Sequence, residues 1–136
     1  MPNVSTTCIS QLLDNQGPRV IDSGASDHIY VNASLFSSLS SPKFPHLITL
    51  ANGAKVASKG VGQISVSPSL NLEFVLFVLN CPFNLISLRQ LTKSSNCSIT
   101  FYVDLFVIHE HGKGQTIGVG HESRGLYYLE TNSSVS

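Results

Sequence analysis

The close spacing of turn residues constrains the fold of this chain more than any other feature. Short runs rich in Val, Ile, Leu and Phe alternate with clusters of Gly, Pro, Asn and Ser throughout the 136 residues. Runs of this kind favour β-strands joined by tight turns. Residues 89–94 differ, because Leu88 and Leu91 give a single short helix one apolar face. The sequence therefore predicts an all-β fold with one short helix.

The pair Asn52-Gly53 is the clearest turn signal in the chain. Asn-Gly is the preferred pair for a two-residue type I′ turn, because both central positions need a positive φ. The flanking segments, residues 46–50 and 55–66, are apolar and β-branched. We therefore expect a β-hairpin with Asn52 and Gly53 at its tip. Two glycines in the second arm predict a bulge or mobility there.

Other segments carry weaker patterns. Asn32 is a residue type that opens helices, so residues 33–39 are expected to form a short helical turn or a loop. Residues 70–79 are almost continuously apolar, which predicts a strand buried on both faces. Further short strands are expected at residues 19–22, 28–31, 84–88, 98–102, 105–109, 115–118 and 125–129.

Composition disfavours several classes of function. Lys and Arg number 8 and so do Asp and Glu, with no basic run, so nothing indicates nucleic acid or an anionic membrane as the partner. The longest apolar run, residues 74–79, is too short to span a bilayer, and the first residues lack a secretory pattern. We expect a soluble, cytoplasmic protein. Only 12% of the residues are charged, which suggests a surface covered by something, such as a second copy of the chain.

The length of the chain and its cysteines narrow the class further. A chain of 136 residues suits one domain with a modest core. Cys8, Cys81 and Cys97 are an odd set at wide spacing, which fits neither a disulfide framework nor a CxxC zinc pattern. We expect reduced thiols, with Cys81 and Cys97 partly buried.

An apolar strand runs directly into an acid, a hydroxyl residue and a glycine at Asp22-Ser23-Gly24. Val20 and Ile21 draw Asp22 toward the interior, where an ionised carboxylate needs a partner. Gly24 is expected to adopt a tight backbone that a Cβ would forbid, and the Ser23 hydroxyl to lock the loop. Taken alone, such a tripeptide is more often a polar turn after a strand.

The ordered set of motifs is more specific than the tripeptide. Asp22 to Ser26, Asn52-Gly53, Pro82 to Leu91 and Asn96 to Phe101 follow one another as in the protease of Ty1/copia retrotransposon Gag-Pol polyproteins. The chain resembles this family over about residues 19–130. The resemblance implies a retropepsin-like, closed β domain with a flap hairpin and one helix, active as a homodimer.

The resemblance also implies a division of the chain. Residues 1–18 would be a leader or linker. Residues 19–103 would form the retropepsin-like aspartic protease core, and residues 104–136 a trailing β segment that leads toward the pre-integrase region.

This chain departs from the family pattern at three places. Family members usually have an aromatic residue, often Trp, shortly before the catalytic Asp, where this chain has Pro18 and Arg19. They often read Tyr-Val-Pro where this chain has Phe77-Val78-Leu79, and have a Gly where it has Ser87, a small residue that also occurs in relatives. The missing Trp leaves open an alternative function, that of a catalytically inactive, transposon-derived β domain that acts in self-association or peptide binding.

The family chemistry gives roles to residues of this chain. Cleavage of a peptide bond by acids needs one carboxylate that activates water and one carboxylic acid that protonates the substrate. The chain has a single Asp-Ser-Gly, so the second acid would be Asp22 of a second copy. Ser23 would stiffen the paired loops, and Gly24 would let the backbone approach. The resemblance thus implies a catalytic motif of Asp22, Ser23 and Gly24, and substrate-binding residues Ala25, Asp27, Asn52, Gly53 and Ile86.

Other polar residues admit less favoured interpretations. Asp27 could supply the second acid, but no spacing rule brings its carboxyl to that of the catalytic Asp. His28 is expected to be a polar strand residue, since two carboxyls need no imidazole. His109 and His111 share one face of a strand, but no Cys or carboxylate completes a metal site with them and His121. We expect no cofactor and no metal, an extended polypeptide substrate, and a location in the cytoplasm or in virus-like particles.

Overall fold

The computed structural model describes residues 18–41, 43, 46–49, 53–79, 81, 83–112 and 114–130. This part of the chain is mostly β-strand with one short α-helix, which confirms the predicted all-β class. The elements are β1 Arg19–Asp22, β2 Ile29–Tyr30, η1 Ala33–Leu35, β3 Phe36–Ser40, β4 Leu47–Thr49, β5 Lys55–Ala57, β6 Gly60–Ser67, β7 Leu70–Phe77, β8 Asn84–Ser87, α2 Leu88–Ser94, β9 Cys97–Phe101, β10 Leu105–Glu110, β11 Thr116–Ser123 and β12 Leu126–Leu129.

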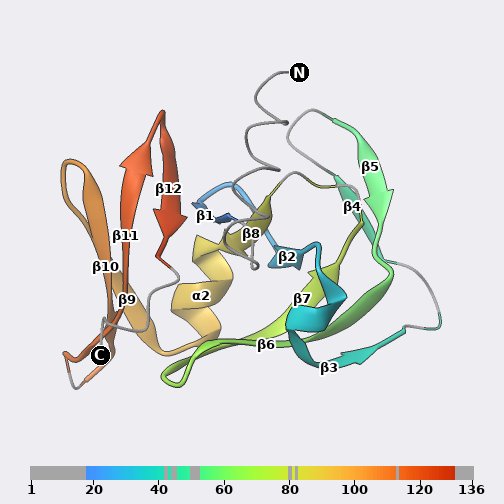
Figure 1. Cartoon of the computed structure of the whole chain (residues 1–136), viewed down its shortest axis with the longest axis horizontal. Coiled ribbons are helices and arrows are strands. Elements are labelled where there is room, and N and C mark those ends of the chain that lie inside the picture. Colours follow the sequence, from blue (N-terminus) through green and yellow to red (C-terminus); the bar gives the residue numbers. More distant parts are fainter. Residues whose placement is uncertain are drawn as a thin grey trace.

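A 10-stranded sheet has the order β3-β6-β7-β2-β8-β1-β12-β11-β10-β9. Figure 1 shows its two wings, with β9 to β12 on one side, β3, β6 and β7 on the other, and α2 between them. β1 is an internal strand that pairs in parallel with β8 and antiparallel with β12. β1 is therefore held on both sides as far as Ile21, and its last residue is paired with Ser87 of β8. This strand ends at Asp22.

One apolar core joins the two wings. Leu91 of α2 belongs to this core and has no exposed surface. A large apolar side chain in such a place stabilises a fold by about 2–5 kcal/mol relative to Ala. The core residues are Ile21, Tyr30, Ile64, Leu70, Leu72, Val75, Ile86, Leu91, Cys97, Phe106, Ile108, Ile117 and Leu129.

The β4–β5 hairpin forms a separate two-stranded sheet. It is anchored through Ile48, which packs with Ile29, Leu76 and Val78 in a second, smaller apolar cluster. At the base of the hairpin, the Ser58 amide donates a hydrogen bond to the carbonyl of His46. The predicted hairpin is therefore present, with its base packed against β2 and β7, but its second arm ends at Ala57. The rest of the predicted arm is wrong, because residues 60–67 form β6 in the 10-stranded sheet.

The register of this hairpin corrects the predicted turn. Thr49 pairs with Lys55. A two-residue turn at Asn52-Gly53 would pair Thr49 with Val56 instead, because the residues that flank such a turn face each other directly. The predicted two-residue turn is therefore wrong, because the observed strand pairing is shifted by one residue from the pairing that it requires. Asn52 lies outside the described residues, and Gly53 has a φ of 87°.

The segment after Asn32 combines a 3-10 turn with a strand. Asn32 caps η1 by accepting a hydrogen bond from the Ser34 amide, as predicted. The chain then continues as β3, which was not predicted because most of its side chains are small and exposed. β3 lies so close to β6 that a Cβ on Gly62 would come within 1.9 Å of the Ser38 carbonyl oxygen. Gly62 is thus needed for close packing, and the predicted bulge is confirmed by a register shift beside it.

β7 is buried on both faces only in its second half. Val75 packs into the main core, whereas Leu76 packs into the smaller cluster on the opposite face. In the first half burial alternates, and Phe74 is 74% exposed with a φ of 57°. The prediction of a strand buried on both faces is wrong there, because the smaller cluster reaches only the second half.

The segment after residue 103 belongs to the same sheet as the rest. β9 pairs with β10, and β12 pairs with β1. The predicted boundary between residues 103 and 104 thus falls inside the β9–β10 hairpin. The two predicted segments share one core, to which Phe106 and Leu129 contribute. Within the described ranges, no helix is both long and apolar enough to cross a membrane.

The two cysteines of the described part are free thiols. Cys81 is half-buried, as predicted, whereas Cys97 is more deeply buried than predicted. Burial raises the pKa of both thiols, and a backbone hydrogen bond from Phe83 partly opposes this effect at Cys81. Both groups are therefore held in the protonated, less reactive form. Cys8 lies outside the described residues.

Candidate active site

The Asp22 carboxylate lies where β1 leaves the sheet. Its Oδ1 accepts a hydrogen bond from the Gly24 amide at 2.8 Å, and its carbonyl lies 3.4 Å from the Ala25 amide. Asp22 is half-buried, whereas Ser23 and Gly24 are exposed. The strand therefore presents an ordered carboxylate at the surface of the chain, next to a backbone that a second molecule can reach.

Gly24 does not have the conformation that the sequence suggested. Its φ is outside the positive range, and a Cβ built on it would meet only Asp22 Oδ1, at 3.4 Å. That distance is an ordinary van der Waals contact. The expectation that a Cβ would be forbidden by the loop backbone is wrong, because the space beside Gly24 is open. A requirement for glycine at this position would have to come from a molecule that approaches from outside.

Ser87 connects this loop to the helix. Its Oγ donates a hydrogen bond to the Ala25 carbonyl at 2.7 Å and accepts one from the Gln90 amide at 3.1 Å. The second bond caps the N-terminus of α2. The Gln90 side chain adds a bond from Nε2 to the Ser26 carbonyl at 3.2 Å. The loop after Asp22 is thus fixed to residues more than 60 positions away in the sequence.

His28 is a buried part of the same network. It is 1% exposed, and its Nδ1 accepts a hydrogen bond from the Ser87 amide at 3.0 Å. Burial lowers the pKa of His28 to about 4, and the negative charge of Asp27 opposes this shift. A protonated Nδ1 could not accept the bond, so both the geometry and the pKa favour the neutral ring. The sequence had indicated only a polar strand residue.

Asp27 lies between the loop and the base of the hairpin. Its carboxylate accepts a hydrogen bond from Ser26 Oγ at 3.2 Å and lies 4.0 Å from Nε2 of His46. The His46 side chain is 57% exposed, so this ion pair contributes little to stability. Asp27 therefore contacts the segment that leads into β4 and the loop itself.

The remaining predicted site residues lie in different surroundings. Ile86 has no exposed surface and pairs with Ile21 behind the loop, so its side chain is not accessible to a substrate in this chain. Ala25 is half-buried within the loop. Gly53 is exposed on the β4–β5 hairpin. The structure brings Asp22, Ser23, Gly24, Ala25 and Asp27 together in one loop, with Ile86 in the core beneath it.

Two contributors to the site were missed from the sequence, namely Ser87 and His28. A Ser directly before a short helical segment is an N-cap signal, and it marks Ser87 correctly as the start of α2. Nothing in the sequence indicates that the same hydroxyl also reaches Ala25, because that contact depends on the parallel pairing of β1 and β8, which places Asp22 opposite Ser87.

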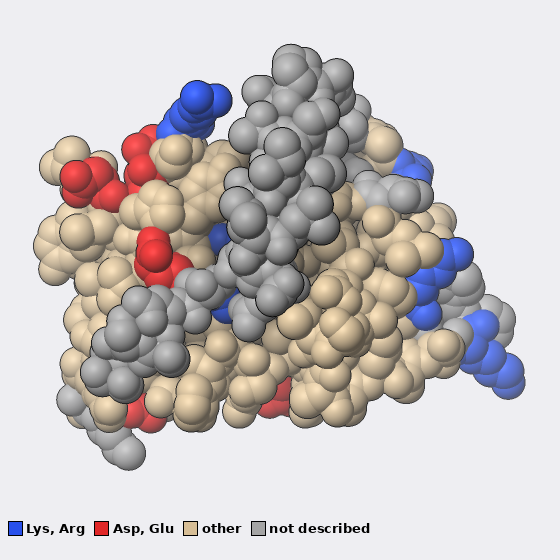
Figure 2. All heavy atoms as spheres, viewed as in Figure 1, with Lys and Arg blue, Asp and Glu red and all other residues tan. Residues whose placement is uncertain are grey.

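Arg19, at the start of β1, is a buried cation. Its Nη2 donates a hydrogen bond to the Glu130 carbonyl at 2.6 Å, which ties β1 to the end of β12. Burial raises the pKa of the neighbouring Tyr30 to about 12, and the positive charge of Arg19 opposes this shift. On the face shown in Figure 2, the described surface is largely uncharged, with its acidic side chains toward the left and most of its basic side chains toward the right.

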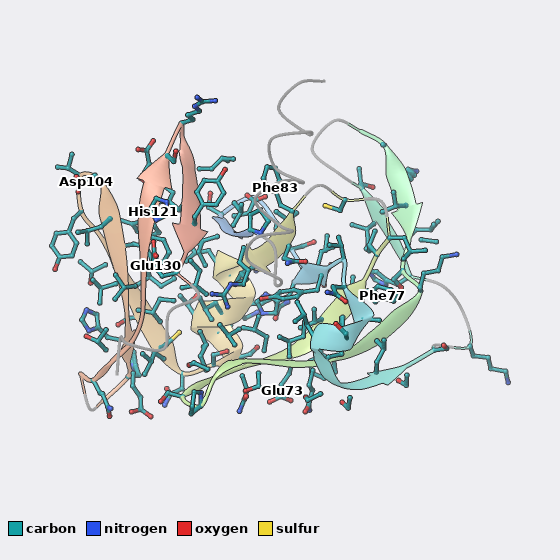
Figure 3. All side chains as sticks on the ribbon, viewed as in Figure 1. Glu73, Phe77, Phe83, Asp104, His121 and Glu130 are labelled. Carbon is teal, nitrogen blue, oxygen red and sulfur yellow. The ribbon has the colours of Figure 1, made fainter. Side chains whose placement is uncertain are left out.

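His121, one of the histidines considered as metal ligands, contacts a carboxylate and an aromatic ring. His121 contacts Glu130 through Nδ1 and stacks on Tyr128 with ring centroids 5.7 Å apart. Figure 3 shows His121 and Glu130 near each other on the β11–β12 side of the molecule. Among the residues that the structure describes, no group of three or more His, Cys, Asp or Glu side chains could hold a metal ion.

Comparison with known proteins identifies the family. The family model described as Pol polyprotein, beta-barrel domain matches residues 20–96, which is more than half of the chain. The chain therefore belongs to this family of Pol-derived β-barrel domains. The matched range runs from β1 through α2 and contains the whole Asp22 loop together with its supports. Searches of curated proteins and of solved structures found no match.

Proposed function

We propose that this chain is an aspartic endopeptidase that processes a retrotransposon Gag-Pol-type polyprotein of the Ty1/copia kind. The observation that carries the proposal is the ordered Asp22 carboxylate at the end of an internal strand, in a loop fixed by backbone hydrogen bonds and by Ser87. Such fixation holds the carboxylate in one position, as acid catalysis requires. The match to a Pol polyprotein domain supports the origin of the chain but not, by itself, the reaction.

The reaction needs two carboxyl groups. Asp22 of one copy and Asp22 of a second copy would meet at a two-fold axis and share one proton, because two adjacent carboxylates cannot both ionise. The charged member activates water, and the protonated member donates its proton to the substrate carbonyl. Ser23 would stiffen the paired loops. Exposed Gly24 offers the open backbone that a second molecule needs in order to approach.

The substrate would be an extended polypeptide. It would lie over the Asp22 loops, near Ala25 and Asp27, with the β4–β5 hairpin as its cover. The mechanism requires no cofactor, since both proton transfers use carboxyl groups. A homodimer in the cytoplasm, or in virus-like particles, is the proposed working form.

The direct test is the substitution Asp22→Asn. An amide can neither activate water nor share the proton, so cleavage of a Gag-Pol-like polyprotein, followed by mass spectrometry, should fall below detection while the thermal unfolding midpoint stays unchanged. Asp104→Asn is the matched control, because Asp104 is exposed on the β9–β10 turn and the chemical change is the same. Equal cleavage by wild type and Asp22→Asn would exclude Asp22 as the catalytic acid.

A non-catalytic role in self-association or peptide binding is the second candidate. It is favoured by the strands β3 and β9, which lie at the two ends of the sheet order, and by exposed apolar side chains beside β9 such as Tyr102 and Val103. An open strand edge can pair with another chain. In that case wild type and Asp22→Asn would bind peptide equally, and neither would cleave it.

A further inference from the structure

We propose that Ser87 and His28 are positioning residues that clamp the Asp22 loop for the reaction. This inference rests on the proposed endopeptidase function, but the geometry that supports it does not. Ser87 has no exposed surface and uses both its hydroxyl and its amide, so one buried residue joins the loop, the helix and the strand β2 region.

The hydroxyl of Ser87 links the loop after Asp22 to α2, two elements that the Gln90 side chain also joins. It accepts from the first turn of α2 and donates to Ala25, three residues beyond the candidate catalytic acid. The bond to Ala25 is short, at 2.7 Å, and the carbonyl that accepts it is part of the turn that also orients the Asp22 carboxylate. Loss of this hydroxyl would leave the turn dependent on bonds within the loop and on the Gln90 side chain.

His28 holds the other end of Ser87. Its Nδ1 accepts a hydrogen bond from the Ser87 amide, which lies at the junction between β8 and α2. An unpaired buried amide is costly, so a side chain without an acceptor at this position would shift Ser87. Asn is the informative replacement for His28, since its Oδ1 can take the place of Nδ1, whereas Leu has a similar branched shape and no acceptor.

Catalytic groups that act together are sensitive to small displacements, and an error of about 1 Å can reduce the rate about a hundredfold. A clamp that sets the position of Asp22 should therefore affect kcat far more than KM. A residue that only stabilises the fold would change the fraction of folded protein and leave kcat per folded chain unchanged.

Ser87→Ala and Thr92→Ala form a matched pair for the test. Both remove one hydroxyl from α2 or its cap, but within the described residues the Thr92 Oγ1 bonds only to the Leu88 and Arg89 carbonyls of the same helix. The first readout is hydrogen exchange of the amides of residues 23–26 in the full chain. We expect at least about tenfold faster exchange in Ser87→Ala and no change in Thr92→Ala.

The second readout is peptide cleavage at a temperature where every variant is folded. We expect Ser87→Ala to lose about tenfold to a hundredfold in kcat with KM within about twofold, and Thr92→Ala to match wild type. His28→Leu should behave as Ser87→Ala, whereas His28→Asn should retain both loop protection and kcat.

The outcomes test the clamp separately from the proposed endopeptidase function. If no variant, wild type included, cleaves peptide, the endopeptidase function fails, and the exchange data alone decide whether the clamp exists. Unchanged exchange at residues 23–26 in both Ser87→Ala and His28→Leu overturns the clamp. Faster exchange with an unchanged kcat overturns its role in positioning the catalytic acid. If His28→Leu does not fold, the clamp is still tested by Ser87→Ala and by the recovery expected in His28→Asn.

Discussion

The loop after Asp22 and the β4–β5 hairpin are held in opposite ways. The loop follows an internal strand and is tied by hydrogen bonds to α2, including the short bond between Ser87 and Ala25. The hairpin is a separate two-stranded sheet whose base is anchored by Ile48 in a small apolar cluster, and Gly53 beyond that base is exposed. The first region is fixed by directional contacts, and the second by non-directional packing at one end.

This difference indicates how the site would divide its tasks. Directional bonds to distant elements fix the position of a carboxylate, as acid catalysis requires. A hairpin that is anchored by packing at its base can open and close at little cost, as a cover over a substrate requires. The weak contact between His46 and Asp27 joins the two regions. Substitutions in the loop should therefore act on chemistry, and substitutions in the hairpin on access.

The largest effect is expected at Gly24 in the loop. Gly24→Ala should leave stability unchanged or raise it by about 0.4–1 kcal/mol, since φ is not positive and the nearest atom to a Cβ is 3.4 Å away. Cleavage should nevertheless fall about a hundredfold or more, because the added methyl group occupies the space through which a second molecule approaches. The measurements are kcat/KM and the thermal midpoint.

Gly112→Ala provides the contrasting control for that experiment. Gly112 is exposed in the turn between β10 and β11 and has a φ of 86°, so Ala is strained there. This variant should lose stability and keep its activity per folded chain. If Gly24→Ala cleaves as fast as wild type, the open side of the loop is not where a second molecule binds.

The next effect is the acid sensitivity of the loop support. The pKa of His28 is about 4 in the folded chain, below the ordinary value of 6.5 that a histidine has when unfolded, so the unfolded chain takes up its proton first as the pH falls. Stability should therefore be lost between about pH 6.5 and pH 4, by up to about 3 kcal/mol, with no contribution from His28 above pH 6.5.

Urea denaturation at a series of pH values measures this loss. His28→Asn removes the titrating ring but keeps an acceptor for the Ser87 amide, so its stability should change less steeply over the same range. An equal slope in wild type and His28→Asn would show that other groups cause the acid sensitivity.

A smaller effect is expected at the hairpin. Gly53 has a φ of 87° and no atom within 4 Å of a Cβ position, so Gly53→Val meets backbone strain but no clash. We expect about a tenfold decrease in kcat/KM and a decrease of only a few degrees in the thermal midpoint, because an exposed segment can rearrange locally. Gly114→Val, at a φ of 68° in another exposed turn, is the control. Equal kinetics in both variants would make the hairpin a passive surface element.

The sequence predicts those parts of the fold that depend on neighbouring residues. The strand that ends in Asp22, the hairpin, the Asn32 cap and the short helix after β8 all have local signals. β3 has none, because its strand conformation depends on close contact with Gly62. The one-residue offset of the hairpin register likewise depends on how the arms pack.

The candidate site shows the same limit. The Asp22 motif could be found from a short run of residues, but its support could not. The Ser87 hydroxyl and Ala25 are 62 residues apart, and the Ser87 amide and His28 are 59 apart. Such contacts exist only once β1 and β8 are paired in register. The prediction that a Cβ on Gly24 would be forbidden is wrong for a related reason, because whether a Cβ fits depends on the whole environment of the loop.

If two copies of Asp22 form one active site, an excess of chains without this carboxylate must inactivate wild-type chains by pairing with them. Wild-type chain is mixed with a ninefold excess of Asp22→Asn chain, and cleavage is measured per wild-type chain at a concentration where sedimentation shows dimers. Random pairing leaves about one wild-type chain in ten with a wild-type partner, so activity per wild-type chain should fall to about one tenth. Activity per wild-type chain that is unchanged by the excess of Asp22→Asn would contradict the shared pair of carboxyl groups.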